Sequence, residues 1–285
     1  MTQRTVFVIA ECCSAWRFGD DHTHLANAYR MIVAAKECGA DAAKFQWCSD
    51  PVLMSQRRND NNPANYEILN YPFDWLVKLK TRCDEVGIEF MVTAFIEKDI
   101  EKIAPLVKRF KVASAESSDE SFVSAHLKYE KEIIASYGFG AFPNTYQYSG
   151  SNLILRIHCV VSYPTPIDQI NLAVLYLGGF EWPVDHSTLM FDGLSDHTTS
   201  TLTGALAVAA GADIIEKHVR LWNTPADNPD RPHSLPFGGD CESCHKGGSF
   251  EDYVDNIRQA ELAMGSGENV MMDCEKANTG RRVKA

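Results

Sequence analysis

The sequence predicts a single-domain (β/α)8 barrel, an α/β fold in which eight parallel strands alternate with helices. Short apolar runs alternate with longer amphipathic segments, and eight of these runs have the length of a strand. The 285 residues suit one such barrel, although the usual domain size would also allow two domains. We expect a barrel domain over residues 1–265 and a polar tail over 266–285.

The predicted strands are apolar runs bounded by glycines and polar residues. In chain order they cover 5–10, 42–46, 88–92, 110–113, 132–135, 153–159, 189–194 and 213–217. Eight strands are the number that closes this kind of barrel. Residues 136–151 lack helical periodicity, so we expect an irregular loop after the fifth strand.

Helices are predicted where apolar residues recur at a spacing of three and four. These segments are 23–38, a helix ending at 86, 201–210 and a last helix opened by Ser249 and Asp252. The first three are followed by Gly39, Gly87 and Gly211. Glycine is favoured there because the residue after a helix often adopts a left-handed conformation.

The composition restricts the partners and the compartment. With 38 acidic and 27 basic residues the net charge is -11, which disfavours nucleic acid and acidic membrane surfaces as partners. A basic cluster at 276–284 lies in the polar tail, where we expect it to be solvated. No run approaches the roughly 20 apolar residues of a membrane span. Nine cysteines without a secretory signal indicate a cytoplasmic protein with reduced thiols and no structural disulfides.

Polar side chains follow almost every predicted strand at its C-terminal end, where barrels of this type carry their active sites. They are Glu11, Lys44, Gln46, Thr93, Lys111, Ser114, Glu116, Ser136, His158, Tyr163, Ser195, Asp196, His197, Glu216, Lys217 and His218. The lysines and hydroxyls predict a local positive pocket for a small anionic ligand such as a phosphate ester. Alternatively, Lys44 and Lys111 extend to solvent or pair with Glu11 and Glu116.

Two histidines predict a metal site. His197 and His218 end the seventh and eighth strands, and neighbouring strands bring such ends close enough to share one divalent cation. Asp196 and Glu216 are candidates to orient the two imidazole rings. One isolated histidine would favour a purely structural role, whereas equivalent positions on adjacent strands favour the metal site.

Six segments in order carry a family resemblance: 9–11, 39–46 with Lys-Phe-Gln, 111–116 with Lys-Val-Ala-Ser-Ala-Glu, 158–166, 193–198 with Gly-Leu-Ser-Asp-His-Thr, and 211–218 ending Glu-Lys-His. Together they resemble the sialic acid synthases, which condense phosphoenolpyruvate with an N-acetylated hexosamine. The resemblance covers about residues 5–265. It implies a metal-dependent enzyme that forms a carbon-carbon bond and is a homodimer.

The resemblance also implies roles for individual residues. Phosphoenolpyruvate would be bound by Lys44, Thr93, Lys111, Ser114, Ser136 and Ser195. The sugar would face Glu11, Gln46, Asn62, Glu116, Tyr163 and Asp230. Mn2+ or a similar ion on His197 and His218 would act as a Lewis acid toward the aldehyde. Glu116, with Lys111 and Lys44, would be catalytic, as the general acid or base for water; its alternative role is a salt-bridge partner.

Departures from the family pattern concern the acceptor sugar. Val161 stands where the family has asparagine, and residues 14–18 replace an Asn-His pair. Family members continue into an antifreeze-like domain that supplies an arginine to the partner subunit, whereas this chain ends at Ala285. We therefore expect a different acceptor, a substitute element or a separate accessory protein.

The insertion with Cys241, Cys244 and His245 predicts either a loop with free thiols or a structural zinc site that could include His233.

The leading functional expectation is the condensation of phosphoenolpyruvate with an N-acetylmannosamine-like aldehyde, which gives a nonulosonic acid and phosphate. One alternative is a synthase acting on a phosphorylated aldose, for which Arg220 and Arg231 are candidates to bind the second phosphate. Another alternative is a barrel that binds a sugar or a partner protein without catalysis.

Overall fold

The computed structural model describes residues 5–140, 154–176, 191–238 and 248–265. Its centre is a parallel sheet that closes on itself, because β1 pairs with both β2 and β8. The strands are β1 (Phe7–Cys13), β2 (Ala42–Trp47), β3 (Glu89–Ala94), β4 (Phe110–Val112), β5 (Ile133–Tyr137), β6 (Ile154–Cys159), β7 (Gly193–Asp196), β8 (Ile214–Arg220) and the short β9 (Leu235–Pro236). The predicted (β/α)8 barrel is confirmed.

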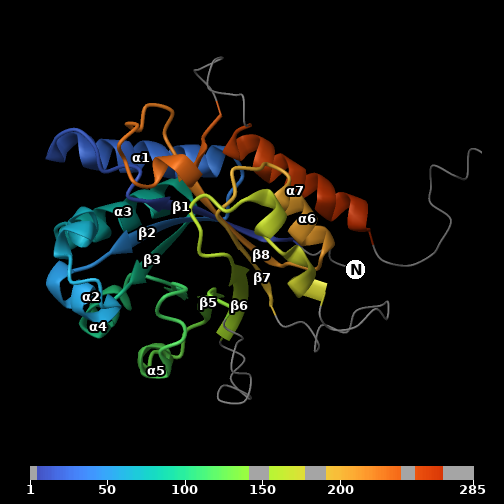
Figure 1. The fold of residues 1–285 in the computed structure, drawn as a ribbon. Helices are drawn as coiled ribbons and strands as arrows, with labels where there is room; N and C mark the ends of the chain where they lie inside the picture. Colours follow the sequence, from blue (N-terminus) through green and yellow to red (C-terminus); the bar gives the residue numbers. More distant parts are fainter. Residues whose placement is uncertain (1–4, 141–153, 177–190, 239–247, 266–285) are drawn as a thin grey trace, which may run out of the picture.

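Helices surround the strands in Figure 1. They are α1 (Asp21–Glu37), α2 (Pro51–Arg58), α3 (Phe73–Val86), α4 (Glu97–Ile103), α5 (Glu120–Leu127), α6 (Thr203–Ala209) and α7 (Phe250–Met264), with 3-10 turns η1 (Pro63–Leu69), η2 (Ile167–Gln169), η3 (Leu172–Tyr176) and η5 (Arg231–His233). Within the described ranges, none of the helices is both long and apolar enough to cross a membrane.

The four predicted helices are confirmed as α1, α3, α6 and α7. Gly39 and Gly87 adopt left-handed φ angles of 84° and 75° after α1 and α3, as the sequence predicts. At the start of α7, Ser249 and Asp252 form the reciprocal bonds of a capping box. The polar segment after β2 contains α2 and η1.

The buried apolar side chains form separate clusters, two of which belong to the barrel strands. A large cluster fills the space between the strands and the helices, and it includes Trp16, Phe45 and Leu76. A smaller apolar layer lies inside the barrel, with Ile9, Ala42, Met91, Ile134, Ile157 and Ile214 from six strands. Successive side chains of a strand point to opposite faces. The side chains two residues further along these strands therefore also point inward, and they form the next layer toward the C-terminal ends. That layer is the floor of the site described below.

Some strand bounds differ from the prediction. β1 continues to Cys13 although the apolar run ends at Ala10, because the polar Glu11 is an inward strand residue that hydrophobicity alone does not detect. β7 begins only at Gly193, four residues after the predicted start. Most of the expected 136–151 loop, the Cys241, Cys244 and His245 insertion and the 266–285 tail lie outside the described residues.

Candidate active site

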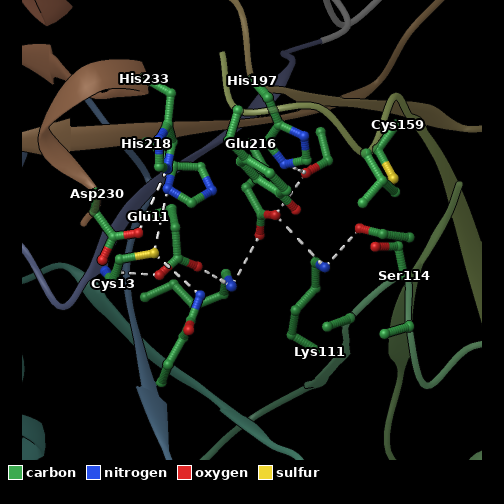
Figure 2. A pocket seen from close by; sticks show the side chains of 18 of the residues that line it. Glu11, Cys13, Lys111, Ser114, Cys159, His197, Glu216, His218, Asp230 and His233 are labelled. Carbon is green, nitrogen blue, oxygen red and sulfur yellow. Dashed lines mark hydrogen bonds and ion pairs between the residues drawn. The ribbon is translucent and has the colours of Figure 1, made fainter. Parts of the chain in front are cut away.

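A pocket of about 300 Å³ opens at the C-terminal ends of the strands (Figure 2). Most of the predicted site residues line it, namely Glu11, Lys44, Gln46, Lys111, Ser114, Ser136, Tyr163, Ser195, His197, His218 and Asp230. Thr93 is buried beside the pocket, where its hydroxyl accepts a hydrogen bond from Lys44 Nζ at 3.2 Å. The strand-end positions therefore converge as the fold class predicts.

Two lysines and two glutamates form the floor of the pocket. Lys44 Nζ forms an ion pair with Glu11 and lies 3.3 Å from Glu216 Oε2. Lys111 Nζ lies 3.5 Å from Glu216 Oε1 and donates a hydrogen bond to Ser136 Oγ at 2.7 Å. The alternative in which these lysines pair with carboxylates is therefore confirmed for Lys44 and Glu11, whereas Lys111 pairs with Glu216.

This pairing sets the charge of the floor. Burial lowers the pKa of Lys44 to about 8, against the opposing effect of Glu216. Burial would raise the pKa of Glu216, but Lys111 and Lys44 outweigh it, and the pKa falls to about 2. An anionic ligand would therefore compete with Glu216 for two ammonium groups that already face the pocket.

His197 and His218 suit a divalent cation. His197 Nδ1 lies 2.8 Å from the Val160 carbonyl oxygen and donates to it, which leaves the Nε2 lone pair on the pocket side. Burial lowers the pKa of His197 to about 4 and that of His218 well below its ordinary value, so both rings are neutral. The ring centroids lie 5.2 Å apart. Neutral imidazoles are the form that binds metals, and the residues present fit a cation.

Asp196 does not orient these imidazoles, contrary to the prediction. Its carboxylate lies 2.9 Å from Lys217 Nζ and accepts a hydrogen bond from the Tyr253 hydroxyl at 2.9 Å. Asp196 faces the helices because its neighbour Ser195 points into the barrel, and adjacent strand residues alternate. Glu216 accepts a hydrogen bond from the Ser195 hydroxyl at 2.9 Å, and this Ser195 Oγ lies 3.5 Å from His197 Nε2.

Two predicted sugar-facing residues lie apart from the pocket. Glu116 is buried and accepts hydrogen bonds from Arg58 at 2.8 to 3.0 Å, as its alternative salt-bridge role predicts. Asn62 is exposed before η1 and donates to Asn65 at 3.1 Å. Glu116 nevertheless borders the pocket through Arg58, which lines it.

Sequence reasoning missed the pocket residues Cys13, Arg58 and Cys159, and it considered His233 only as a possible ligand of a structural zinc site. Cys13 follows Glu11 by two residues, and strand alternation would have found it had the strand been extended past Ala10. Arg58 ends the unpredicted α2, and its guanidinium lies over the Phe95 ring at 5.3 Å. His233 comes from η5, which no sequence pattern indicated.

Comparison with known proteins decides the family. The family model described as "NeuB family" matches residues 31–269. The chain belongs to the NeuB family. A pseudaminic acid synthase of Campylobacter jejuni is 31% identical over 100% of this chain and 81% of the relative. An N,N'-diacetyllegionaminic acid synthase of Legionella pneumophila is 30% identical over 95% of this chain and 76% of the relative.

A solved structure supports the NeuB-family fold. The N-acetylneuraminic acid synthetase of Leptospira borgpetersenii, in complex with citrate, superposes with a TM-score of 0.79 at 23% identity. The match covers 98% of this chain and 92% of that chain. Because the NeuB-family relatives are named synthases, the expectation that the chain is an enzyme is confirmed.

Proposed function

We propose that the protein condenses phosphoenolpyruvate with the aldehyde of an N-acetylated hexosamine such as N-acetylmannosamine. The products are a nonulosonic acid and inorganic phosphate. The observation that carries the proposal is the pocket floor of a NeuB-family chain, where Lys44 and Lys111 lie next to two neutral histidines. Cations suit the phosphate and carboxylate of the donor, and the histidines suit a metal that activates the acceptor.

The chain's own residues would bind and orient the donor. Lys44 and Lys111 release Glu216 in part and bind the phosphate or carboxylate oxygens instead, at a similar distance. The hydroxyls of Ser114, Ser136 and Ser195, with Thr93 behind them, donate further hydrogen bonds to these oxygens. Holding both anionic ends fixes carbon 3 of the enol toward the acceptor, which lowers the entropic cost of the reaction.

The reaction balances without an oxidant. Carbon 3 of phosphoenolpyruvate forms a bond to the aldehyde carbon, water adds to carbon 2, and the bond from carbon 2 to the phosphate oxygen breaks. A divalent cation such as Mn2+, held by His197 and His218, would stabilise negative charge on the aldehyde oxygen. We retain Glu116 as the proposed acid or base because it is hydrogen-bonded to Arg58, which lines the pocket, and burial raises the pKa of its carboxyl above the ordinary value.

The phosphorylated-aldose alternative loses the two residues that the sequence offered for it. Arg220 donates to the Leu221 carbonyl oxygen at 3.3 Å, and Arg231 donates to the Thr224 carbonyl oxygen. Neither arginine is among the residues that line the pocket in the described part of the chain. These two arginines therefore give the phosphorylated-aldose alternative no support.

The test is phosphate release from a mixture of the protein, Mn2+, phosphoenolpyruvate and each member of an aldose panel that includes N-acetylmannosamine. We expect release with an N-acetylated hexosamine and little with phosphorylated aldoses. The His218→Ala variant should lose at least 99% of the rate, roughly the effect of removing a metal ligand. If folded protein releases no phosphate with any aldose of the panel, the barrel is non-catalytic. If the His218→Ala variant releases phosphate at an unchanged rate, the metal role of His218 is refuted.

A further inference from the structure

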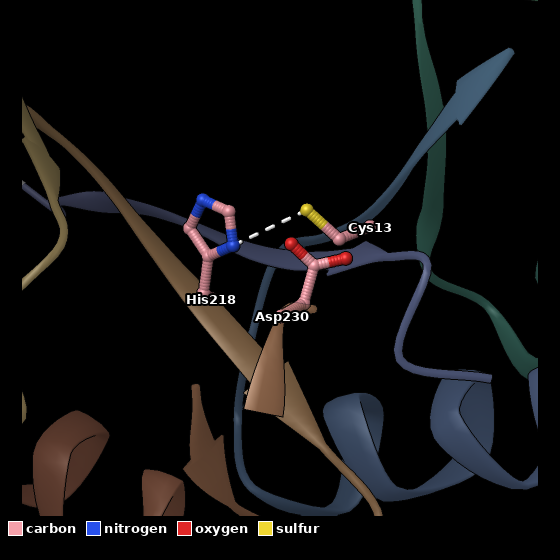
Figure 3. Close-up of side chains that lie close together, drawn as sticks. All are labelled: Cys13, His218 and Asp230. Carbon is pink, nitrogen blue, oxygen red and sulfur yellow. Dashed lines mark hydrogen bonds between the residues drawn. The ribbon is translucent and has the colours of Figure 1, made fainter. Parts of the chain in front are cut away.

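Three side chains capable of binding metal converge at one wall of the pocket (Figure 3). Each of Cys13, His218 and Asp230 offers a ligand atom, and these atoms all lie within 4.8 Å of one another. Cys13 Sγ lies 3.2 Å from His218 Nδ1. The three residues come from the end of β1, from β8 and from the turn before η5, so the fold brings together positions that are far apart in the sequence.

The backbone at Cys13 is held in a conformation that a cysteine rarely adopts. Its φ angle is 45°, and the pairing of β1 with β2 shifts register between Glu11 and Cys13. The Cys13 amide donates a hydrogen bond to Glu11 Oε1 at 2.7 Å, which fixes this shift. Bulges re-aim side chains near active sites, and a strained non-glycine residue there points to a function for the side chain.

Neighbouring side chains hold the Asp230 carboxylate and the Cys13 sulfur in place. Asp230 accepts a hydrogen bond from the Ser14 amide at 2.9 Å and another from the Ser14 hydroxyl. Gln46 Nε2 donates a hydrogen bond to Cys13 Sγ at 3.0 Å, which helps to fix the position of the sulfur. Ligands that are oriented before the ion arrives are typical of built metal sites.

We propose that Cys13, His218 and Asp230 form a thiolate-containing site for a divalent transition metal. A thiolate favours ions such as Zn2+, Co2+ and Fe2+ over hard ions such as Mg2+, and the carboxylate and imidazole complete a mixed set. The site shares His218 with the two-histidine arrangement, so one ion occupies this wall. This inference rests on geometry and does not depend on the condensation reaction.

The probe is Co2+, because a cobalt-thiolate bond produces a charge-transfer absorption band in the near ultraviolet. The full-length chain would carry Cys241→Ser, Cys244→Ser and Cys274→Ser, which removes the thiols outside the described residues that could produce the same band. We expect the band to saturate at one Co2+ per chain. Cys13→Ser should abolish it and weaken Co2+ binding at least tenfold, while Mn2+ binding changes less than threefold.

Matched variants separate the site from a general effect of losing a thiol. Cys12 is the adjacent buried cysteine and packs in the core between strands and helices, so Cys12→Ala should keep the band. Cys13→Gly should lose the band while unfolding at the same or a higher temperature, because glycine adopts a φ angle of 45° without strain.

Two results would overturn the proposal. Co2+ that binds without a charge-transfer band, or not at all, would show that the thiol is not a ligand. A band that persists in folded Cys13→Ser would place the thiolate elsewhere. Phosphate release is measured separately on the same samples: synthase activity without a cobalt-thiolate band overturns this site alone, and the band without activity overturns the proposed function alone.

Discussion

The carboxylate of Glu216 is shared between two ammonium groups in the pocket floor. One oxygen lies 3.5 Å from Lys111 and accepts from Ser195, and the other lies 3.3 Å from Lys44. Such an arrangement keeps both lysines ordered without a ligand. The net contribution of each lysine to anion binding is therefore the difference between two free energies, that of its contact with the ligand and that of its contact with the carboxylate.

Lys111→Met tests this contribution. Removal of one ammonium group deletes a charge-assisted hydrogen bond worth about 1.5–3 kcal/mol, so kcat/KM for phosphoenolpyruvate should fall roughly 10- to 100-fold. Steady-state phosphate release measures the loss. Lys36→Met removes an exposed cation at the end of α1 and should leave the value unchanged. Equal kinetics of Lys111→Met and the unmodified protein would show that Lys111 does not bind the donor.

Glu116→Gln distinguishes the two roles of this carboxyl group. As an acid or base Glu116 would affect the chemical step, so we expect kcat to fall by about 100-fold or more while KM for phosphoenolpyruvate stays within threefold. The amide still accepts a hydrogen bond from Arg58, which preserves packing. A rise in KM at constant kcat would assign Glu116 to the positioning of Arg58 instead.

At the scale of elements, the predictable part of the structure is the part built from apolar patterns. The strands were predicted because burial on both faces requires continuous apolar runs. The helices α4 and α5 have seven and eight residues and were missed because, unlike the equally short α6, neither is followed by a glycine that marks its end. The start of α2 could have been found, since Asp50 caps it and Pro51 occupies its first turn.

Site residues, too, were easier to predict where they lie on strands than where they lie on other elements. Residues in the C-terminal parts of strands, such as Lys44 in β2 and His218 in β8, were predictable because the fold class places all those strand ends together. Arg58 and His233 belong to elements between strands, whose positions depend on tertiary packing. Asn62 was assigned by its distance along the chain to a neighbouring motif, and such a distance does not determine on which side of a turn a residue lies.

Within α5, His126 predicts a pH effect on stability. Its ring is buried between Phe110 and Phe122, with centroids at 4.9 and 5.0 Å, and burial lowers its pKa to about 4. The unfolded chain takes up this proton near pH 6.5 and the folded chain near pH 4, so stability falls as the pH drops through that window.

The His126 contribution amounts to about 3 kcal/mol at most. Denaturant unfolding measured between pH 7 and pH 4 should therefore show a smaller loss of stability in His126→Leu than in the unmodified protein. The leucine keeps an apolar side chain between the two phenylalanine rings. Parallel pH profiles for the two proteins would contradict the assignment.

At the scale of the whole molecule, the barrel interior is divided into layers. The inner apolar layer, represented by Ile9, Ile157 and Ile214, lies under the charged layer of Lys44, Lys111 and Glu216. The histidines and Tyr163 lie further toward the open ends of the strands. Under the proposed function, the donor's anionic groups would bind in the deepest part of the pocket, and the acceptor aldehyde would meet the donor from the open side.

The apolar layer closes the bottom of the pocket, so we expect ordered binding and ordered release. We expect the donor to bind before the sugar, and the phosphate formed from the donor to dissociate after the sugar acid. We expect phosphate to inhibit competitively against phosphoenolpyruvate, and the sugar to bind measurably by calorimetry only after phosphate or donor is present. Tight sugar binding to the empty pocket, followed by donor binding, would contradict this order. The six apolar side chains of the inner layer therefore have a kinetic consequence: by closing one end of the pocket they set the expected order in which substrates bind and products dissociate.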